Sequence, residues 1–293
     1  MRVLATLIDG KTIAQTVRAR AAERAQKLAE MGIVPGLAVI LVGEDPASQI
    51  YVRNKSRAAK KVGVQSQTIV MPVETTEAEV LAIVAQLNED AAVDAILVQS
   101  PLPKHIDEEK VQEAILPSKD VDGFHPENIG RLFANRAGYY PIANTPRGVM
   151  TLLDATQQTL HGKQAIVIGR SILVGRPMFS LLERANMTVT LAHRHTPRAE
   201  LRRLTQQADV VVVATGVPGL ITGDDLKEGA TVIDVGINRL ADGSLVGDVD
   251  FASAEPKAAF ITPVPGGVGP MTIATLMQTT VELAAVNHGV ELD

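Results

Sequence analysis

Short apolar runs alternate with longer amphipathic segments along most of this chain. Residues 37–42 and 95–98 are compact aliphatic runs bounded by glycine or polar residues, which is typical of buried strands. Residues 46–62 and 76–88 instead carry apolar positions at helical spacing, and residues 67–71 form another short strand. Buried strands that alternate with helices predict a parallel sheet with helical crossovers.

The same alternation begins again at Ala165, after a polar, turn-rich stretch over residues 117–146. The second set of predicted strands covers residues 165–168, 189–192, 210–214, 231–235 and 260–261, with helices near 175–185 and 197–207. Such a series is typical of a doubly wound, Rossmann-like sheet, which binds nucleotides at the carboxyl ends of its strands. The pattern therefore predicts an α/β protein with two parallel-sheet domains.

The two series set the predicted domain boundaries. The first domain covers residues 1–145 and starts with a long amphipathic helix over residues 11–31, and the second covers residues 146–270. A length of 293 residues also favours two domains over one. The final predicted helix, about residues 271–288, lies beyond the second series. We predict that it packs back on the first domain, so that residues 271–293 complete that domain.

Composition narrows the classes of function. Hydrophobic residues make up 46% of the chain and charged residues 21%, so sizeable cores can be buried. The net charge of −5 and an aromatic content of 3% argue against nucleic-acid binding. The absence of cysteine excludes disulfides and thiolate chemistry, and it is compatible with a reducing cytoplasm. Residues 1–9 are too short and too polar for a signal peptide, and no run approaches the roughly 18 apolar residues of a membrane helix. We expect a cytoplasmic protein with no membrane partner.

A loop over residues 262–272 contains three prolines and three glycines. Glycine lets a flat ligand approach bare backbone, and unpaired N–H groups at a helix start suit anions and carbonyl oxygens. A rigid interdomain turn would have the same composition. The candidate ligand-binding residues in this loop are Pro265, Gly266, Gly267 and Thr272.

A glycine turn joins a strand to a helix start in residues 166–177. It departs from G-x-G-x-x-G, because Ser171 stands at the second glycine and the last glycine comes one residue late. Gly169 can still make the tight turn, and Gly175 can allow close packing of the helix. Arg170 and Ser171 can donate hydrogen bonds to phosphate or ribose. Alone, the pattern does not separate a cofactor site from an ordinary turn.

The second strand of this domain ends in His193-Arg194-His195-Thr196, with no acidic residue. NAD enzymes usually place an acid there to bind the ribose 2′-hydroxyl, whereas a cation suits the 2′-phosphate of NADP. We therefore predict NADP as the cofactor, with Arg194 as its ligand and Arg198 as a secondary candidate. A solvated basic loop is the alternative. His193 and His195 have no third ligand in view, so no metal site is predicted.

Tyr51 and Lys55 in the first domain are four residues apart and share a helix face. A phenol beside an ammonium group can order a proton path and tune the amine. An amphipathic helix whose lysine reaches water gives the same pattern. Short-chain dehydrogenases also carry Y-x-x-x-K, but there it follows the glycine-rich loop. Here it precedes that loop by more than a hundred residues, which argues against that family.

Polar side chains also follow the strand over residues 95–98. Gln99 stands at its carboxyl edge, where a neutral amide can bind a substrate carbonyl or hold Lys55 without supplying a charge. Asp122 can grip the guanidinium-like edge of a ring through two hydrogen bonds. Asp120 can instead cap the local turn, and the same role is the alternative for Asp122 when either acid is taken alone.

Together these segments resemble the bifunctional family of methylenetetrahydrofolate dehydrogenase/methenyltetrahydrofolate cyclohydrolase over nearly the whole chain. The blocks that carry the resemblance are Tyr51-x-x-x-Lys55, residues 98–103, residues 119–124, Thr145-Pro146-Arg147-Gly148, residues 169–177, residues 232–238, Gly247-Asp248-Val249 and the Pro/Gly loop over residues 262–272. Each block is weak alone, but their shared order is specific.

The resemblance implies a folate-binding first domain, completed by the final helix, and an NADP-binding second domain. It implies oxidation of 5,10-methylenetetrahydrofolate to 5,10-methenyltetrahydrofolate with NADP⁺, followed by hydrolysis to 10-formyltetrahydrofolate. This chemistry belongs to one-carbon metabolism and serves purine, methionine and histidine biosynthesis. The family usually forms homodimers.

The resemblance also assigns roles to residues. Lys55 becomes the main catalytic group, Gln99 positions or tunes it, Tyr51 supports it and Asp122 holds the pterin, and the last three contact the folate. Because the methenyl product is cationic, a lysine kept partly neutral by desolvation can act as a base toward water. The implied NADP-binding residues are Gly169, Arg170, Ser171, Val174, Gly175, Arg194, Thr215, Gly216 and Ile237.

The chain departs from the family pattern in two blocks. Ser100 stands where leucine is common, and Ala143-Asn144 stands where Pro-Cys is common. These changes bear on the balance of the two rates, while the retention of Lys55 argues against a dehydrogenase-only relative. Two alternatives remain open at this point. One is another two-domain NAD(P)-dependent dehydrogenase of the shikimate or amino-acid type, and the other is a non-catalytic folate- or nucleotide-binding regulator.

Overall fold

Two parallel sheets organise the chain, one of three strands and one of six. The computed structural model describes residues 4–291, apart from the side chains at positions 46 and 47. It divides into two compact units. The three-stranded unit comprises Gln15–Asn144 and the chain from Ile273 onward, and the six-stranded unit comprises the chain up to Ala14 and Thr145–Thr272.

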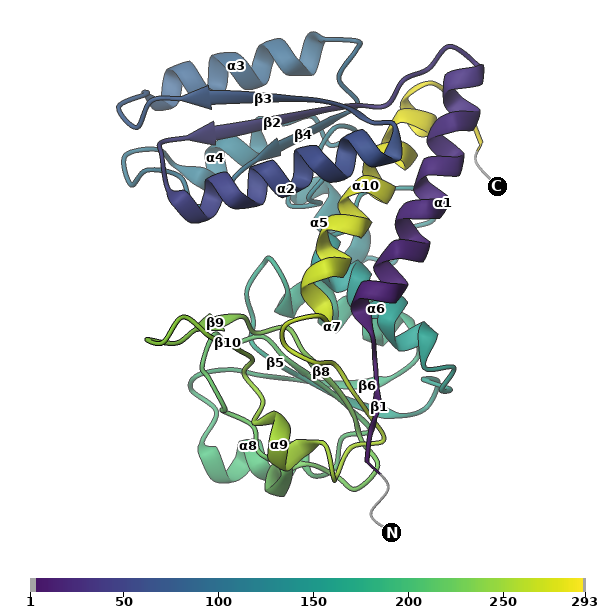
Figure 1. Ribbon diagram of the computed structural model, residues 1–293, viewed down its shortest axis with the longest axis vertical. Helices are drawn as coiled ribbons and strands as arrows, with labels where there is room; N and C mark the ends of the chain where they lie inside the picture. Colours follow the sequence, from purple (N-terminus) through teal and green to yellow (C-terminus); the bar gives the residue numbers. More distant parts are fainter. Residues whose placement is uncertain (1–3, 292–293) are drawn as a thin grey trace. The chain divides into compact units, whose positions relative to one another are not determined.

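The three-stranded sheet has the order β3-β2-β4, with all strands parallel. Its strands are β2 (Gly36–Val42), β3 (Gln65–Met71) and β4 (Ala95–Val98), and the connecting helices are α2 (Pro46–Val62) and α3 (Glu77–Glu89). Every residue of β2 and β4 is buried, as expected for strands covered on both faces. Figure 1 shows α3 on one face of this sheet and α2 on the other, which confirms the predicted parallel sheet with helical crossovers and gives this unit an αβα layering.

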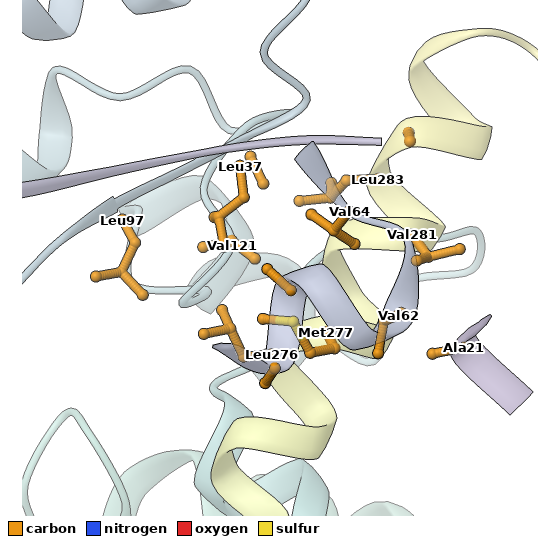
Figure 2. Packing of buried hydrophobic residues seen from close by; sticks show 14 of the residues in the cluster. Ala21, Leu37, Val62, Val64, Leu97, Val121, Leu276, Met277, Val281 and Leu283 are labelled. Atoms are coloured by element: carbon orange, nitrogen blue, oxygen red, sulfur yellow. The ribbon is translucent and has the colours of Figure 1, made fainter. Parts of the chain in front are cut away.

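The last helix, α10 (Val268–Asn287), contributes to the core of the three-stranded unit. Leu276 and Val281 of α10 lie in the same buried cluster as Leu37 of β2 and Val62 of α2 (Figure 2). Full burial of side chains of this size contributes about 1.5–3 kcal/mol each. The helix is therefore an integral part of this unit, and the prediction that it packs back on the first domain is confirmed.

The six-stranded sheet is parallel throughout and has the order β1-β11-β8-β7-β5-β6. Its strands are β1 (Thr6–Leu7), β5 (Gln164–Ile168), β6 (Thr188–Ala192), β7 (Val210–Val213), β8 (Thr231–Asp234) and β11 (Phe260–Ile261). The chain passes from β5 to its neighbour β6 and then crosses to β7 on the other side of β5. Doubly wound sheets bind nucleotides at such a reversal, so the predicted Rossmann-like architecture is confirmed.

The remaining elements are short or connect the sheets. They are α1 (Gly10–Glu30), α4 (Glu108–Glu113), α5 (Pro126–Phe133), α6 (Asn144–Ala155), α7 (Gly175–Arg184), α8 (Arg198–Thr205), α9 (Phe251–Ala254), the 3₁₀ turn η1 (Gly223–Asp225) and a hairpin of β9 (Asn238–Arg239) and β10 (Leu245–Val246). Within residues 4–291, no helix combines the length and the apolar character that crossing a membrane requires.

The structure differs from the predicted boundaries at the start of the chain. The sequence pattern groups residues 1–145 together, whereas β1 pairs in parallel with β11, with Thr6 beside Phe260 and Leu7 beside Ile261. Two exposed residues are too few to show a hydrophobic period, and the pairing is made by backbone groups that every residue carries. The first strand therefore left no signal in the side-chain pattern.

Candidate active site

Helix α2 carries the two residues of the Y-x-x-x-K pattern. Asp45 caps the helix by accepting a hydrogen bond from the Ser48 N–H at 2.7 Å. The helix packs one face on the sheet, where Val52 is buried. Lys55 lies partly buried beside that face, and Tyr51, one turn earlier, is 49% exposed. The spacing thus places both side chains along one part of the helix surface.

Lys55 and Gln99 are in direct contact. The Lys55 Nζ donates a hydrogen bond to Gln99 Oε1 at 3.0 Å. Gln99 directly follows β4, and its backbone N–H still donates to Ile40 O at 2.9 Å, so the sheet fixes its position. Its side-chain Nε2 donates to Ser100 O at 2.7 Å, which turns the amide oxygen toward the lysine. The predicted pairing of a lysine with a neutral amide at the sheet edge is therefore present.

Asp122 lies in the loop that follows the β4 edge, where Asp120 forms an isolated bridge with Ile96. Burial raises the pKa of the Asp122 carboxyl, and the nearby charge of Lys55 acts in the opposite direction. Burial likewise lowers the pKa of Lys55, and the Asp122 carboxylate counteracts that shift. Lys55, Gln99 and Asp122 therefore form one cluster, in which the lysine is brought closer to its neutral form.

Asp120 has a different role from Asp122. Its Oδ2 accepts hydrogen bonds from the His125 N–H at 2.8 Å and from Asn128 Nδ2 at 2.9 Å. Only 3% of Asp120 is exposed. These contacts fasten the loop to the start of α5, in agreement with the turn-capping alternative.

Ser100, one of the two departures from the family pattern, contacts an acidic side chain. Its hydroxyl donates a short hydrogen bond to Glu108 Oε1, and the Leu102 N–H lies 3.5 Å from Glu108 Oε2. Glu108 begins α4, so this helix fastens the backbone immediately after Gln99. The serine therefore gives the loop after β4 a polar attachment to α4.

In the six-stranded unit, the glycine turn after β5 is tightly packed. Gly169 has φ of +122°, and a Cβ there would lie 2.2 Å from Ala214 O. A Cβ on Gly175 would lie 2.0 Å from Gly169 O. Ser171 Oγ accepts a hydrogen bond from the Val174 N–H at 3.2 Å, and no side chain caps the start of α7. A helix start this close to bare backbone fits a dinucleotide phosphate, and Arg170 is exposed beside it.

Asp248 shapes the loop after β7, a role that the sequence did not reveal. Its Oδ2 accepts hydrogen bonds from the Thr215 N–H at 2.6 Å, the Thr215 hydroxyl at 2.9 Å and the Gly216 N–H at 2.9 Å. Its Oδ1 accepts from Asn238 Nδ2 at 2.8 Å. Burial raises the pKa of the adjacent Asp234 to about 6. The block Gly247-Asp248-Val249 was the available signal, but only the fold shows what it holds.

The two candidate arginines after β6 are in different situations. Arg194 is exposed, and its Nε lies 3.2 Å from His195 Nε2. Arg198 instead forms an ion pair with the buried Asp225 at 2.6 Å. Arg194 is therefore accessible to a ligand, whereas Arg198 already fastens α8 to η1. Among the described residues, no group of three or more His, Asp or Glu is placed to hold a metal.

The Pro/Gly loop lies in the six-stranded unit, whereas Lys55, Gln99 and Asp122 lie in the other. Gly266 and Gly267 are buried, and a Cβ on Gly10 would lie 1.8 Å from Gly267 O, so the loop backbone closely approaches the start of α1. Pro265 is exposed. Two further candidate residues can be placed by single contacts. The Thr272 hydroxyl lies 2.9 Å from the Thr145 hydroxyl. The Cδ1 atom of Ile237 would lie 3.4 Å from a Cβ built on Gly269.

Comparison with known proteins supports the same interpretation, a folate enzyme with a catalytic and a cofactor-binding domain, for both units. Residues 8–122 match the family described as "Tetrahydrofolate dehydrogenase/cyclohydrolase, catalytic domain", and residues 143–288 match its "NAD(P)-binding domain". The "Bifunctional protein FolD" of Lactiplantibacillus plantarum is 58% identical over 278 residues, which cover 95% of this chain and 96% of that protein.

Solved structures agree. The bifunctional FolD enzyme of Campylobacter jejuni superposes with a TM-score of 0.94 at 46% identity, covering 97% of this chain and 99% of that one. The Trypanosoma brucei dehydrogenase-cyclohydrolase, solved with NADP cofactor and an inhibitor, gives a TM-score of 0.94 at 37% identity over 98% and 99% of the two chains. These matches favour neither a shikimate-type dehydrogenase nor a non-catalytic regulator. The chain therefore belongs to the tetrahydrofolate dehydrogenase/cyclohydrolase family of enzymes.

Proposed function

We propose that this protein performs both reactions of its family. It oxidises 5,10-methylenetetrahydrofolate to the 5,10-methenyl cation with NADP⁺, and it then hydrolyses that cation to 10-formyltetrahydrofolate. The observation that carries the proposal is the contact between Lys55 Nζ and Gln99 Oε1 inside a cluster that also contains Asp122. Membership of the family and the match to both of its domains support the two activities.

Lys55 acts as the base of the hydrolytic step. A neutral amine removes a proton from water as the water oxygen attacks the methenyl carbon. The resulting hydroxyl then gives up its proton as the C–N5 bond breaks and N5 takes up a proton, which leaves the formyl group on N10. Burial lowers the pKa of Lys55, and a cationic substrate beside it would repel the ammonium form, so both effects increase the neutral fraction. Gln99 accepts from the lysine and fixes the direction of the amine.

Asp122 holds the pterin ring. An ionised carboxylate can accept two hydrogen bonds from adjacent N–H groups of the aminopyrimidine edge, which fixes the ring in its plane. Tyr51, exposed one helical turn from Lys55, lies where its ring can contact the substrate. Both side chains belong to the three-stranded unit, which we assign as the folate-binding part of the enzyme.

The six-stranded unit binds NADP. The bound cofactor supplies the acceptor for the hydride that leaves the methylene carbon. The start of α7, with Arg170 and Ser171, receives the pyrophosphate, and the loop of Thr215 and Gly216 is held in place by Asp248. Arg194 binds the 2′-phosphate and sets the preference for NADP over NAD.

The remaining assignments are part of the proposal. Family resemblance suggests a homodimer, and β3 lies at the edge of its sheet with Val70 62% exposed, so a second copy has an edge to pair with. We also propose a cytoplasmic location and a role in supplying one-carbon units for purine, methionine and histidine biosynthesis.

A continuous spectrum tests the two activities together. The purified enzyme is mixed with 5,10-methylenetetrahydrofolate and NADP⁺, and the NADPH and methenyl bands are recorded at the same time. We expect NADPH to rise while methenyl remains low, because hydrolysis removes it. Accumulation of methenyl in step with NADPH would support the dehydrogenase and contradict the hydrolase. The absence of NADPH would contradict the NADP-dependent dehydrogenase.

A further inference from the structure

A buried amide stands behind Asp122. Asn144 is only 4% exposed, and its Nδ2 donates hydrogen bonds to Asp122 Oδ1 and to Val121 O, both at 3.0 Å. Its Oδ1 accepts a hydrogen bond from the Thr279 hydroxyl at 3.0 Å. The neighbours dictate this orientation, because only the NH₂ end of the amide can face a carbonyl and a carboxylate together.

We propose that Asn144 is a positioning residue for folate binding, which fixes the Asp122 carboxylate in the orientation that grips the aminopyrimidine edge. The inference rests on the proposed role of Asp122 and adds the group that directs it. Asn144 is one of the three residues, with Ser100 and Ala143, at which this chain departs from the common family pattern. The proposed role of Asn144 therefore applies to this chain, and not to family members that have another residue at this position.

The attachment reaches the far end of the sequence. Asn144 begins α6, and Thr279 lies on α10, 135 positions further along the chain. Thr279 is fully buried, so its hydroxyl is fixed by the same packing that brings α10 into the three-stranded unit. Thr279, Asn144 and Asp122 thus form a hydrogen-bonded chain from the buried helix to the carboxylate.

A second asparagine in the same unit shows what is special about this arrangement. Asn128 donates from Nδ2 to Asp120 Oδ2 and to Pro117 O, both at 2.9 Å, so it clamps an aspartate in the same way. Asp120 is buried and is further closed by the His125 N–H. Asp122 is only partly buried, and it is therefore the aspartate of the two that can receive a ligand.

The amide also acts on the charge of Asp122. The charged groups that act on this carboxyl are Lys55 of α2 and Asp120 of the same loop, while α6 and α10 contribute the neutral Asn144 and Thr279. Burial is the main influence on Asp122 and raises its pKa, and the charge of Asp120 acts in the same direction, while the charge of Lys55 and the hydrogen bond from Asn144 lower it. Loss of the amide leaves a carboxyl that is protonated at higher pH.

The test measures kcat and KM for 5,10-methylenetetrahydrofolate against pH in wild type and in Asn144→Ala. We expect KM to rise about ten- to hundredfold with kcat changed much less, because a misdirected carboxylate holds the pterin more weakly in the substrate complex and in the transition state alike. The acid limb of kcat/KM should move to higher pH. Asn128→Ala is the matched control, since it loses the same kind of clamp but frees only Asp120. Its acid limb should stay in place or move to lower pH.

A double-mutant cycle separates positioning from general damage. In an Asp122→Asn background, Asn144→Ala should add less than about twofold to KM, because the amide acts through that carboxylate. Thr279→Val keeps the amide of Asn144 but removes the hydroxyl that holds it, so KM should also rise, by a smaller factor. This second variant tests the inference if Asn144→Ala does not fold.

Two results would overturn the inference. One is a KM within twofold of wild type in both Asn144→Ala and Thr279→Val, and the other is a full KM rise that persists in the Asp122→Asn background. Either can occur while Lys55→Met abolishes hydrolysis as expected. The failure of this inference is therefore distinguishable from the failure of the proposed function.

Discussion

The amine of Lys55 donates a hydrogen bond to the side-chain oxygen of Gln99 across 44 positions of sequence, at 3.0 Å. The acceptor is a neutral amide, so it orients the amine without stabilising the ammonium form as a carboxylate would. Burial can therefore keep the pKa of Lys55 below its ordinary value. The choice of amide at position 99 is what allows a buried lysine to serve as a base.

Replacing Gln99 with glutamate tests that relationship. A carboxylate beside Lys55 should raise the lysine pKa. Because the neutral amine is the active form, the increase of the hydrolysis rate with pH should be shifted to higher pH than in wild type. The measurement is the pH profile of methenyltetrahydrofolate hydrolysis for Gln99→Glu beside Gln99→Asn, which remains uncharged. Superimposable profiles for wild type and Gln99→Glu would contradict the assignment.

Removing the amine itself should stop hydrolysis. Lys55→Met keeps an apolar chain of similar length, so the helix and its packing are retained while the base is lost. We expect the hydrolysis rate to fall about 10²–10⁴-fold, the usual contribution of a general base. NADP binding, followed by cofactor fluorescence, should be unchanged. Near-normal hydrolysis in this variant would remove Lys55 from the mechanism.

Arg194 is expected to decide between the two nicotinamide cofactors. In Arg194→Ala, KM for NADP⁺ should rise about tenfold, since an exposed charge pair with a phosphate is weakened by solvent. KM for NAD⁺, which has no 2′-phosphate, should change little. Arg198→Ala is the comparison, because that arginine pairs with Asp225 and should affect stability more than cofactor choice. Equal effects on both cofactors would contradict the role of Arg194.

Asp248 should matter to cofactor binding without touching the cofactor. Its carboxylate accepts from two backbone N–H groups and a hydroxyl in the Thr215–Gly216 loop. Asp248→Asn exchanges one accepting oxygen for a donor, which should cost about 1–3 kcal/mol of unfolding free energy. The expected signature is a lower Tm together with a higher KM for both NADP⁺ and NAD⁺. A lower Tm with unchanged KM values would limit Asp248 to a structural role.

Much of the architecture was predictable because it depends on side-chain periodicity. The strands over residues 37–42 and 95–98 are fully buried, and the aliphatic runs in the sequence predict this burial directly. Features made by backbone alone were not predictable. Strand β1 has two residues and pairs through peptide groups, and the β9–β10 hairpin is equally short. Neither is long enough to establish an apolar pattern.

The site shows the same division. Lys55, Gln99 and Asp122 could be proposed from their positions at a helix face, a strand end and a loop, and the resemblance to a family joined them. The contributions of Asp248 and Asn144 depend on hydrogen-bond partners that are far away in the sequence. A side chain whose partners are all distant in sequence leaves no local sequence pattern. Their importance becomes visible only when the hydrogen-bond partners are known.

The inclusion of α10 in the three-stranded core has a consequence for synthesis on the ribosome. Leu276 and Val281 are translated only after the whole of Thr145–Thr272, which belongs to the other unit, yet the core that surrounds Leu37 is incomplete without them. The three-stranded sheet must therefore wait, with part of its apolar surface uncovered, until the chain has been translated past Val281. Nascent chains halted before residue 276 should remain open to proteolysis and chaperone binding, although Gln15–Asn144, most of the unit, has already been translated.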